Sequence, residues 1–330
     1  MKLLRYISFR LLGIVVVLLF IAVITFAIFY LLPSDPARAA CGRPCTPANL
    51  EKLSLFMGID QPWFVQLGEF LKGIVFGRSF GTGVAVDCNA PCFGYSFLRN
   101  SSVTDLVIAR FPATASIAIG AAVLFLLIGV ASGLIASLKR NTFLDRGIMT
   151  VSIAGVSTPV YLAGILAILI FGFALRLFPT SGYVPFEDSP IEWLRRLVLP
   201  WISLAFVSAA VYARLTRAEM LEVMGQDYIR TARAKGLRER RVIGRHGLRT
   251  ALLPVVTVFG LDLGALLGGA VVTERVFGIP GMGSLLIEAV AYVDVQLIVG
   301  LTLFAAFAVV LLNFLVDLAY GILDPRVRVG

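Results

Sequence analysis

The chain has 330 residues, of which 58% are hydrophobic and 15% are charged, and its mean hydropathy is +0.91. About a quarter of the residues of an ordinary soluble domain are charged, and here the apolar residues fall into long runs between charges, so the composition excludes a soluble globular protein and indicates a polytopic membrane protein. The formal net charge of +9 comes largely from basic residues between those runs, which argues against a nucleic-acid-binding surface.

Six charge-poor runs have the length of a membrane-spanning helix, which needs roughly 20 apolar residues. They cover residues 11–33, 111–138, 147–175, 197–213, 250–273 and 295–316. The first run opens with basic residues, as a secretory signal would, but its apolar stretch exceeds the ~7–15 residues of such a signal. We therefore predict an all-α membrane protein with six transmembrane helices, the first of them uncleaved within residues 1–33.

The segment after the first run, residues 34–105, is too long for a simple connection, and we expect it to form a small extracytoplasmic domain. It contains all the cysteines of the chain, which are Cys41, Cys45, Cys88 and Cys92. An even number of cysteines in an oxidising compartment predicts two disulfides. A zinc site is the alternative, although zinc more often uses C-x2-C or C-x4-C spacing than the C-x3-C spacing seen twice here. The sequence leaves the three possible pairings open.

Thr158 and Pro159 interrupt the third run. Proline removes a backbone hydrogen-bond donor and bends a helix, so both residues are candidates for a kink beside a translocation pathway. Proline is also tolerated in membrane helices that have no such role, and that interpretation stays open.

Basic residues indicate the orientation, because lysine and arginine concentrate in cytoplasmic loops. They occur in the N-terminal segment, after the second run, after the fourth run and near the C-terminus. With six helices, these four segments fall on one side of the membrane. We predict that both termini are cytoplasmic and that the chain lies in the inner or plasma membrane of a prokaryote.

The loop after the fourth run is the most basic part of the chain. Residues 214–249 contain ten lysines and arginines, more than the topology alone needs. We expect the fourth helix to end near Arg214. Asp227 can then cap a short helix, and Gly236 can end it. A second helix, from about Arg238, would lead to Pro254 at the start of the fifth membrane helix.

The short helix predicted in this loop has the features of a docking element. Its small residues allow close approach, and its arginines suit insertion into a groove on another protein. The candidate contact residues are Asp227, Tyr228, Arg230, Thr231, Ala232, Arg233, Lys235 and Gly236. A solvated loop that only sets the topology is the alternative interpretation.

Asp262 is the one acidic residue within a run. An ionisable group inside a membrane is costly, so we expect Asp262 to line a translocation pathway, to pair with a partner subunit or to make a polar packing contact. Glu274 and Arg275 follow on the predicted outer side. They are candidates to contact a binding protein, and plain interfacial charges are the alternative.

The sequence indicates no chemical reaction that this chain would carry out by itself. It has no G-x-x-x-x-G-K-[ST] phosphate loop, so it cannot hydrolyse ATP by that route. His246 is the single histidine, which excludes an H-E-x-x-H zinc site. We predict no catalytic residue, no metal site and no cofactor in this chain.

Several stretches resemble one transporter family. They are residues 178–183 (FPTSGY), 214–218 (RLTRA), 227–237 (DYIRTARAKGL), 245–256 (RHGLRTALLPVV), 267–277 (LGGAVVTERVF), 280–283 (PGMG), 313–320 (NFLVDLAY) and 324–326 (DPR). Together they are similar to the permeases of peptide-type ABC importers, which include dipeptide, oligopeptide and nickel permeases. The resemblance covers nearly the whole chain and is strongest from Arg110 onward.

The resemblance implies the fold of a type I ABC importer over residues 106–324, with a coupling loop at 214–250 and a cytoplasmic tail at 325–330. It also implies a second homologous permease subunit, two cytoplasmic ATPase subunits that hold ATP and magnesium, an extracytoplasmic substrate-binding protein and surrounding lipid. Asp227 to Gly236 would be the coupling helix that sits in a cleft of one ATPase. Peptides are the expected substrate, and nickel complexes, glutathione and some sugars are handled by related permeases.

A secondary transporter or channel that acts without an ATPase is the alternative function. It would be expected to show inverted repeats and several buried charges along the spans. Only Asp262 lies within a span, and no repeat is visible in the sequence. An importer subunit driven by partner ATPases is therefore the favoured hypothesis.

Overall fold

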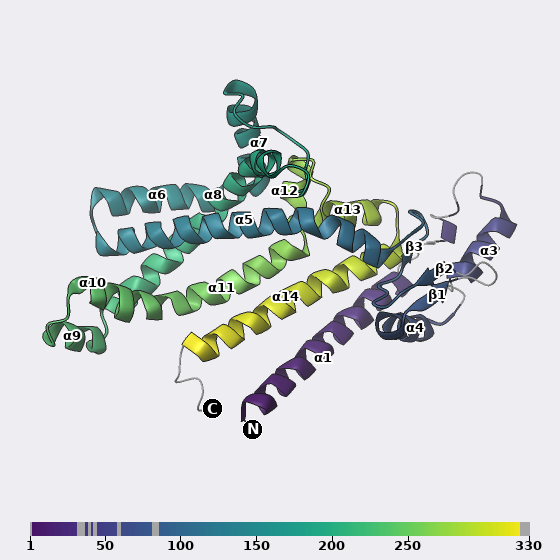
Figure 1. Ribbon diagram of the computed structural model, residues 1–330, viewed down its shortest axis with the longest axis horizontal. Helices are drawn as coiled ribbons and strands as arrows, with labels where there is room; N and C mark the ends of the chain where they lie inside the picture. Colours follow the sequence, from purple (N-terminus) through teal and green to yellow (C-terminus); the bar gives the residue numbers. More distant parts are fainter. Residues whose placement is uncertain are drawn as a thin grey trace. The chain divides into compact units, whose positions relative to one another are not determined.

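The computed structural model of the protein describes residues 2–31, 37–38, 41, 45–57, 61–80 and 86–323. This part is helical except for two short antiparallel strand pairs (Figure 1). The chain divides into two compact units, one of Met1–Thr114, Leu267–Val271 and Pro280–Leu311, the other of Ala115–Leu266, Val272–Ile279 and Leu312–Gly330. The predicted domain boundaries at residues 33, 105 and 324 mark where the chain is expected to enter or leave the membrane, so they differ in kind from the limits of these compact units. They stay predictions. The predicted tail, residues 325–330, lies outside the described residues.

The first unit packs its N-terminal helix against later parts of the chain. Its first elements are α1 (Lys2–Leu31), α3 (Pro47–Met57), α4 (Trp63–Phe76), β1 (Arg78–Phe80), β2 (Val86–Cys88), β3 (Tyr95–Ser96) and β4 (Ser101–Ser102). It also contains α13 (Met282–Ala291) and the start of α14 (Val295–Leu323). The rings of Phe26 in α1 and Phe70 in α4 lie 5.3 Å apart, and Leu303 of α14 is buried in the same cluster. Burial of a side chain such as Phe70 contributes ~1.5–3 kcal/mol, so this cluster holds α1 and α4 to α14.

The cysteines form two local bridges beside the strands. Cys41 is joined to Cys45 and Cys88 to Cys92, so of the pairings that the sequence left open the structure has the most local one. The second bridge belongs to a small core with aromatic side chains, in which Phe80, Tyr95 and Phe97 are in mutual ring contact. The bridge and the rings together provide the buried interior that such short strands need.

The second unit is a bundle of long helices. Its elements are α5 (Val103–Leu138, from Ala115 on), α6 (Phe143–Ser157), α7 (Val160–Ala167), the π-helix η1 (Ile168–Ala174), α8 (Pro190–Met224), α9 (Asp227–Ala234), α10 (Glu239–Arg241), the π-helix η2 (Val242–Leu248), α11 (Arg249–Gly268) and most of α12 (Val271–Val276). Small residues bring α5 close to α8: a Cβ added to Gly129 would lie 2.5 Å from the Cβ of Tyr212. Glycine at such contacts lets membrane helices approach closely.

In the part of the chain that the structure describes, each predicted run is largely helical, with breaks at residues 158–159 and 269–270. Among the described residues, four helices are long and apolar enough to cross a membrane by themselves: 103–138, 190–224, 239–268 and 295–316. A fifth candidate span is the pair 143–157 and 160–174, which is bent by 103°, and a shorter apolar stretch covers 12–28 in α1. The observation supports a multi-pass membrane protein with four or five evident spans.

Two predicted helix ends were wrong. The fourth helix does not end near Arg214 but continues as α8 to Met224, because arginine favours helix as well as leucine does, and a charge marks an edge of the membrane without ending the helix. Pro254 does not start the fifth helix but lies within α11, and the helical segment runs from Glu239 to Gly268. Neighbouring groups can satisfy the backbone that a proline frees inside a membrane helix.

Candidate coupling site

The short helix α9 occupies the centre of the basic loop, as the sequence predicts. Gln226 precedes it as the N-cap without a side-chain hydrogen bond, so the prediction that Asp227 is the cap was wrong. Asp227 is the first helical residue, where a carboxylate still favours the helix through the positive end of its dipole. Gly236 ends the segment with a φ of +74°, a conformation that side chains with a Cβ rarely adopt.

One face of α9 is anchored to its own chain. Ile229 and Ala232, one turn apart, are buried against Val242 and Leu237 and the side chain of Met224. The prediction placed Ala232 on the docking surface, and the structure turns it inward. The reason is tertiary: the loop after Gly236 folds back over α9, and these two apolar residues are the ones that it covers.

The other face of α9 is exposed. It carries all the other candidate contact residues, which are Asp227, Tyr228, Arg230, Thr231, Arg233, Lys235 and Gly236. Arg230 pairs loosely with Asp227, at 3.5 Å, and both side chains remain largely exposed. The face therefore presents arginine and lysine side chains around a small residue, Thr231, that would permit close contact.

Two contacts hold the turn behind α9. Arg233 donates to both carboxylate oxygens of Glu239 in α10, at 2.8 Å and 3.3 Å. The hydrogen bond to Glu239 raises the pKa of the Arg233 guanidinium, which is charged in any case. The hydroxyl of Tyr228 donates to the carbonyl oxygen of His246, at 3.5 Å. Exposed contacts of this kind are each worth ~0–1 kcal/mol, and their effect is to orient α9 rather than to stabilise the fold.

Asp262 has a partner within the chain. The hydroxyl of Tyr212 in α8 donates to Asp262 Oδ2 in α11 at 2.8 Å, and Tyr212 itself is completely buried against the ring of Phe125, 4.9 Å away. This contact matches the polar packing role among the alternatives for Asp262. Lining of a pathway by Asp262 stays a prediction.

The helix is sharply broken at Thr158 and Pro159. Helix α6 ends at Ser157, α7 begins at Val160, and the two axes differ by 103°. Proline restricts the residue before it to extended backbone, and Thr158 accordingly has a φ of −90° and a ψ of 120°. The predicted kink is therefore a right-angled break, while its place beside a pathway stays a prediction.

The two candidate residues for contact with a binding protein differ in exposure. Glu274 in α12 is completely buried, whereas Arg275 is exposed. Contact of either residue with a binding protein stays a prediction. The sequence could not separate adjacent residues of a short helix by their burial.

An ion pair that the sequence did not reveal joins α6 to α8. Arg217 donates from Nε and Nη2 to the two carboxylate oxygens of Asp145, at 2.7 Å and 2.8 Å. In the sequence, Arg217 is one of the basic residues that indicate the topology, and nothing marks it as half of an ion pair. The one local signal was Thr142, three residues before Asp145. This spacing is typical of the start of a helix and would have placed Asp145 in a first helical turn.

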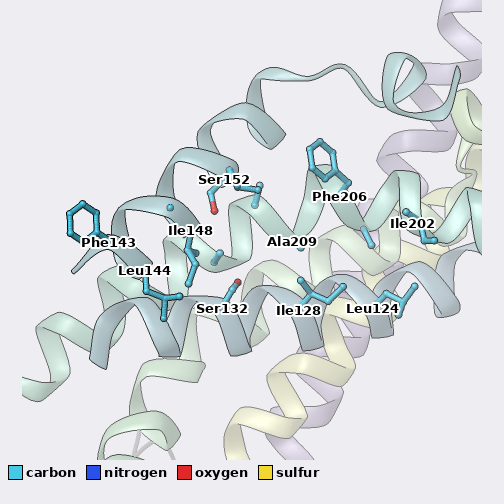
Figure 2. Close-up of a pocket in the computed structure, with 15 residues that line it drawn as sticks. Leu124, Ile128, Ser132, Phe143, Leu144, Ile148, Ser152, Ile202, Phe206 and Ala209 are labelled. Atoms are coloured by element: carbon cyan, nitrogen blue, oxygen red, sulfur yellow. The ribbon is translucent and has the colours of Figure 1, made fainter. Parts of the chain in front are cut away.

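An apolar groove with a volume of about 620 Å³ lies between α5, α6 and α8 (Figure 2). Leu124 and Ile128 line it from α5, Ile148 and Ser152 from α6, and small residues of α8 such as Ala209 complete it. The groove shows that α6 is packed against the other two helices incompletely.

The chain matches known membrane proteins over most of its length. Residues 126–329 match the family described as binding-protein-dependent transport system inner membrane component, and residues 3–118 match the N-terminal family of such membrane components. A putative peptide transport system permease protein of Brucella abortus is 41% identical over 312 residues, which are 94% of this chain and 95% of the relative. The glutathione transport system permease protein of Escherichia coli K12 is 36% identical over 98% of this chain and 99% of its own.

The fold also has a solved counterpart. A chain from inward-facing structures of the MetNI methionine ABC transporter aligns with a TM-score of 0.55 at 17% identity, over 67% of this chain and 97% of its own. At that identity the likeness concerns the fold alone. The family matches and the full-length relatives show that this chain is an ABC importer permease of the peptide and nickel type, and it belongs to the binding-protein-dependent transport system inner membrane component family.

Proposed function

We propose that the chain is the channel-forming permease subunit of an ATP-driven importer that translocates di- or oligopeptides by alternating access. The observation that carries this proposal is α9, a short helix anchored by one face at the junction of two candidate spans and exposed on the other. An anchored helix with a free polar face can bind a partner and pass that partner's movement to the helices on either side.

The proposed complex contains a second homologous permease subunit, two ATPase subunits that bind ATP and magnesium, and an extracytoplasmic binding protein. Six spans with both termini in the cytoplasm would place α9 and its basic loop beside the ATPases. The binding protein would select the substrate. The relatives named for peptide and for glutathione transport support a peptide-like substrate, since glutathione is itself a small peptide.

Cysteine cross-linking tests the docking of α9. All four native cysteines are disulfide-bonded, so an introduced cysteine is the only free thiol among the described residues. Thr231→Cys lies on the exposed face, and Ala232→Cys, one residue later, lies on the buried face. In an assembled complex we expect a short thiol-to-amine cross-linker to join Thr231→Cys to an ATPase subunit with a far higher yield than Ala232→Cys.

Equal yields from both positions, or none from either in a complex that contains the ATPases, would overturn the docking role of α9. Uptake of peptide by reconstituted vesicles provides the second measurement. We expect uptake only with the binding protein outside and ATP on the ATPase side. Uptake that persists without ATPase subunits would favour a secondary transporter.

A further inference from the structure

The Asp145–Arg217 ion pair is fixed from several directions. The two parallel hydrogen bonds are a bidentate arrangement, the strongest geometry between a carboxylate and a guanidinium. The backbone N–H of Asn141 donates to Asp145 Oδ2 at 2.9 Å, and the backbone N–H of Asp145 donates to Thr142 Oγ1 at 3.4 Å. The Asp145 side chain is 4% exposed and that of Arg217 is 24% exposed. A buried and fully bonded pair of this kind has one geometry, unlike a surface ion pair.

The pair lies close to the coupling helix along the chain. Arg217 is about two turns before Met224, the last residue of α8. The end of α8 is in turn held by α11 and by α9. Met220 and Val223 pack with Ala251 of α11, and Met224 contacts the buried face of α9. Any displacement of α9 therefore moves the part of α8 that carries Arg217.

Helix α6 packs along α8, with one close contact near each of its ends. One is the ion pair at Asp145, and the other is Gly155, where an added Cβ would lie 2.8 Å from the Cβ of Ala210. The two places are about 15 Å apart along α6. Between them lies the apolar groove of Figure 2, lined by Ile148 and Ser152 of α6, so side-chain packing there is incomplete.

The groove leaves packing incomplete beside the first turns of α6, and there the ion pair adds a directional contact that fixes the register of α6 on α8. We propose that the Asp145–Arg217 pair is a mechanical joint that makes α6 move together with α8 when the ATPases displace α9. The movement then continues to the break at Pro159 and so to α7. Both residues are positioning residues, because their proposed effect acts through the helices that they join. The proposal rests on the proposed function, because it assigns a route to the ATP-driven movement.

Charge variants of the complete complex in vesicles test the joint. Asp145→Asn and Arg217→Gln remove one partner each, and the double variant Asp145→Arg with Arg217→Asp exchanges them. Radiolabelled trialanine and glutathione are the transport probes. We expect each single variant to transport roughly tenfold less probe per ATP hydrolysed, the scale of a typical coupling energy between sites. The exchange should recover much of the loss. Arg195→Gln, which removes an exposed ion pair with Glu192 on the same helix, should leave the ratio unchanged.

A distance measurement tests the joint independently of the substrate and of the exchange variant. One spin label is attached at Thr150→Cys in α6 and the other at Val211→Cys in α8. Both positions are exposed. In the complex with native Asp145 and Arg217, we expect the distance between the labels to stay constant when nucleotide is trapped with vanadate, and to change in the single charge variants. A change with the native pair intact, or an unchanged transport ratio in both single variants, would overturn the joint.

The outcomes separate the joint from the function that it serves. If neither probe is taken up in an ATP-dependent way while the label distances behave as expected, the proposed substrate or function fails and the joint stands. If uptake is ATP-dependent and the charge variants match the native complex in both measurements, the joint fails and the proposed function stands.

Discussion

At the scale of single residues, Gly236 controls the shape of the coupling segment. Its φ of +74° ends α9 and turns the chain back over Ile229 and Ala232. An added Cβ at Gly236 meets no distant atom within 4 Å, so a substitution there strains only the local backbone and disturbs no neighbouring side chain. Because a substitution at Gly236 affects the backbone alone, it tests directly whether the backbone turn fixes α9.

Gly236→Ala should loosen α9, because a left-handed conformation costs alanine roughly 1–2 kcal/mol. We expect hydrogen exchange of the α9 amides to accelerate by roughly 5- to 30-fold, which is that cost expressed as a change in the local opening equilibrium. Gly244→Ala is the matched control, because it also has open space around its Cβ and lies in helical backbone. It should leave exchange unchanged or slow it. Equal acceleration in both variants would contradict the role assigned to the turn.

The predictions for single residues succeeded where a residue's own chemistry determines its conformation. They failed where distant parts of the chain determine its surroundings. The helix stop at Gly236 follows from glycine's own conformational freedom. The burial of Ala232 and of Glu274 depends on which part of the chain folds over them, and no local pattern encodes that. Asp145 was missed because its partner, Arg217, is 72 residues away in the sequence.

At the scale of elements, the break between α6 and α7 is the least regular part of the bundle. The sequence shows one charge-free apolar run from 147 to 175, and a hydropathy reading assigns it one helix with a possible bend at Pro159. The structure makes two helices at 103° and continues α7 as a π-helix. Proline indicates where a helix bends, but the size of the angle depends on the surrounding packing.

Pro159→Ala should weaken the fixed angle, because alanine restores a backbone donor and frees Thr158 to become helical. Spin labels at Thr150→Cys in α6 and Ile165→Cys in α7 would report it, and we expect a broader and longer distance distribution in the variant. Pro200→Ala, inside the continuous helix α8, is the control and should leave the distribution unchanged. An unaltered distribution for Pro159→Ala would show that tertiary packing alone holds the break.

At the scale of the whole molecule, the distribution of charge determines the topology that we propose. Apolar runs and basic loops were enough to identify a multi-pass membrane protein, because they depend on composition over long stretches. The family came from the resemblance of particular stretches, such as residues 227–237 and 267–277. The exact spans were harder to assign. A helix such as α8 extends past its apolar run, since no rule of composition requires a helix to end at the membrane surface.

Thiol labelling of single exposed positions tests this topology. Phe143→Cys, at the start of α6, should react with a membrane-impermeant maleimide only in inside-out vesicles, and Ile191→Cys, at the start of α8, only in intact cells. Both native side chains are strongly exposed, at 90% and 72%. Prior permeabilisation, which should make both react, is the control for accessibility. Reaction from the same side at both positions would contradict the six-span arrangement.

The local pairing of the cysteines has a consequence for how the protein is made. Each bridge joins cysteines four positions apart, and the pairs follow one another along the chain. In the topology that we propose, the segment is exported from its N-terminal end and exposes Cys41 and Cys45 before Cys88 emerges. Oxidation in the order of emergence would then yield the final pairing directly. Thiol–disulfide exchange, the slow step that corrects wrong pairings, is then unnecessary during biogenesis. A host that supplies an oxidant but no disulfide isomerase should therefore be sufficient to mature this permease.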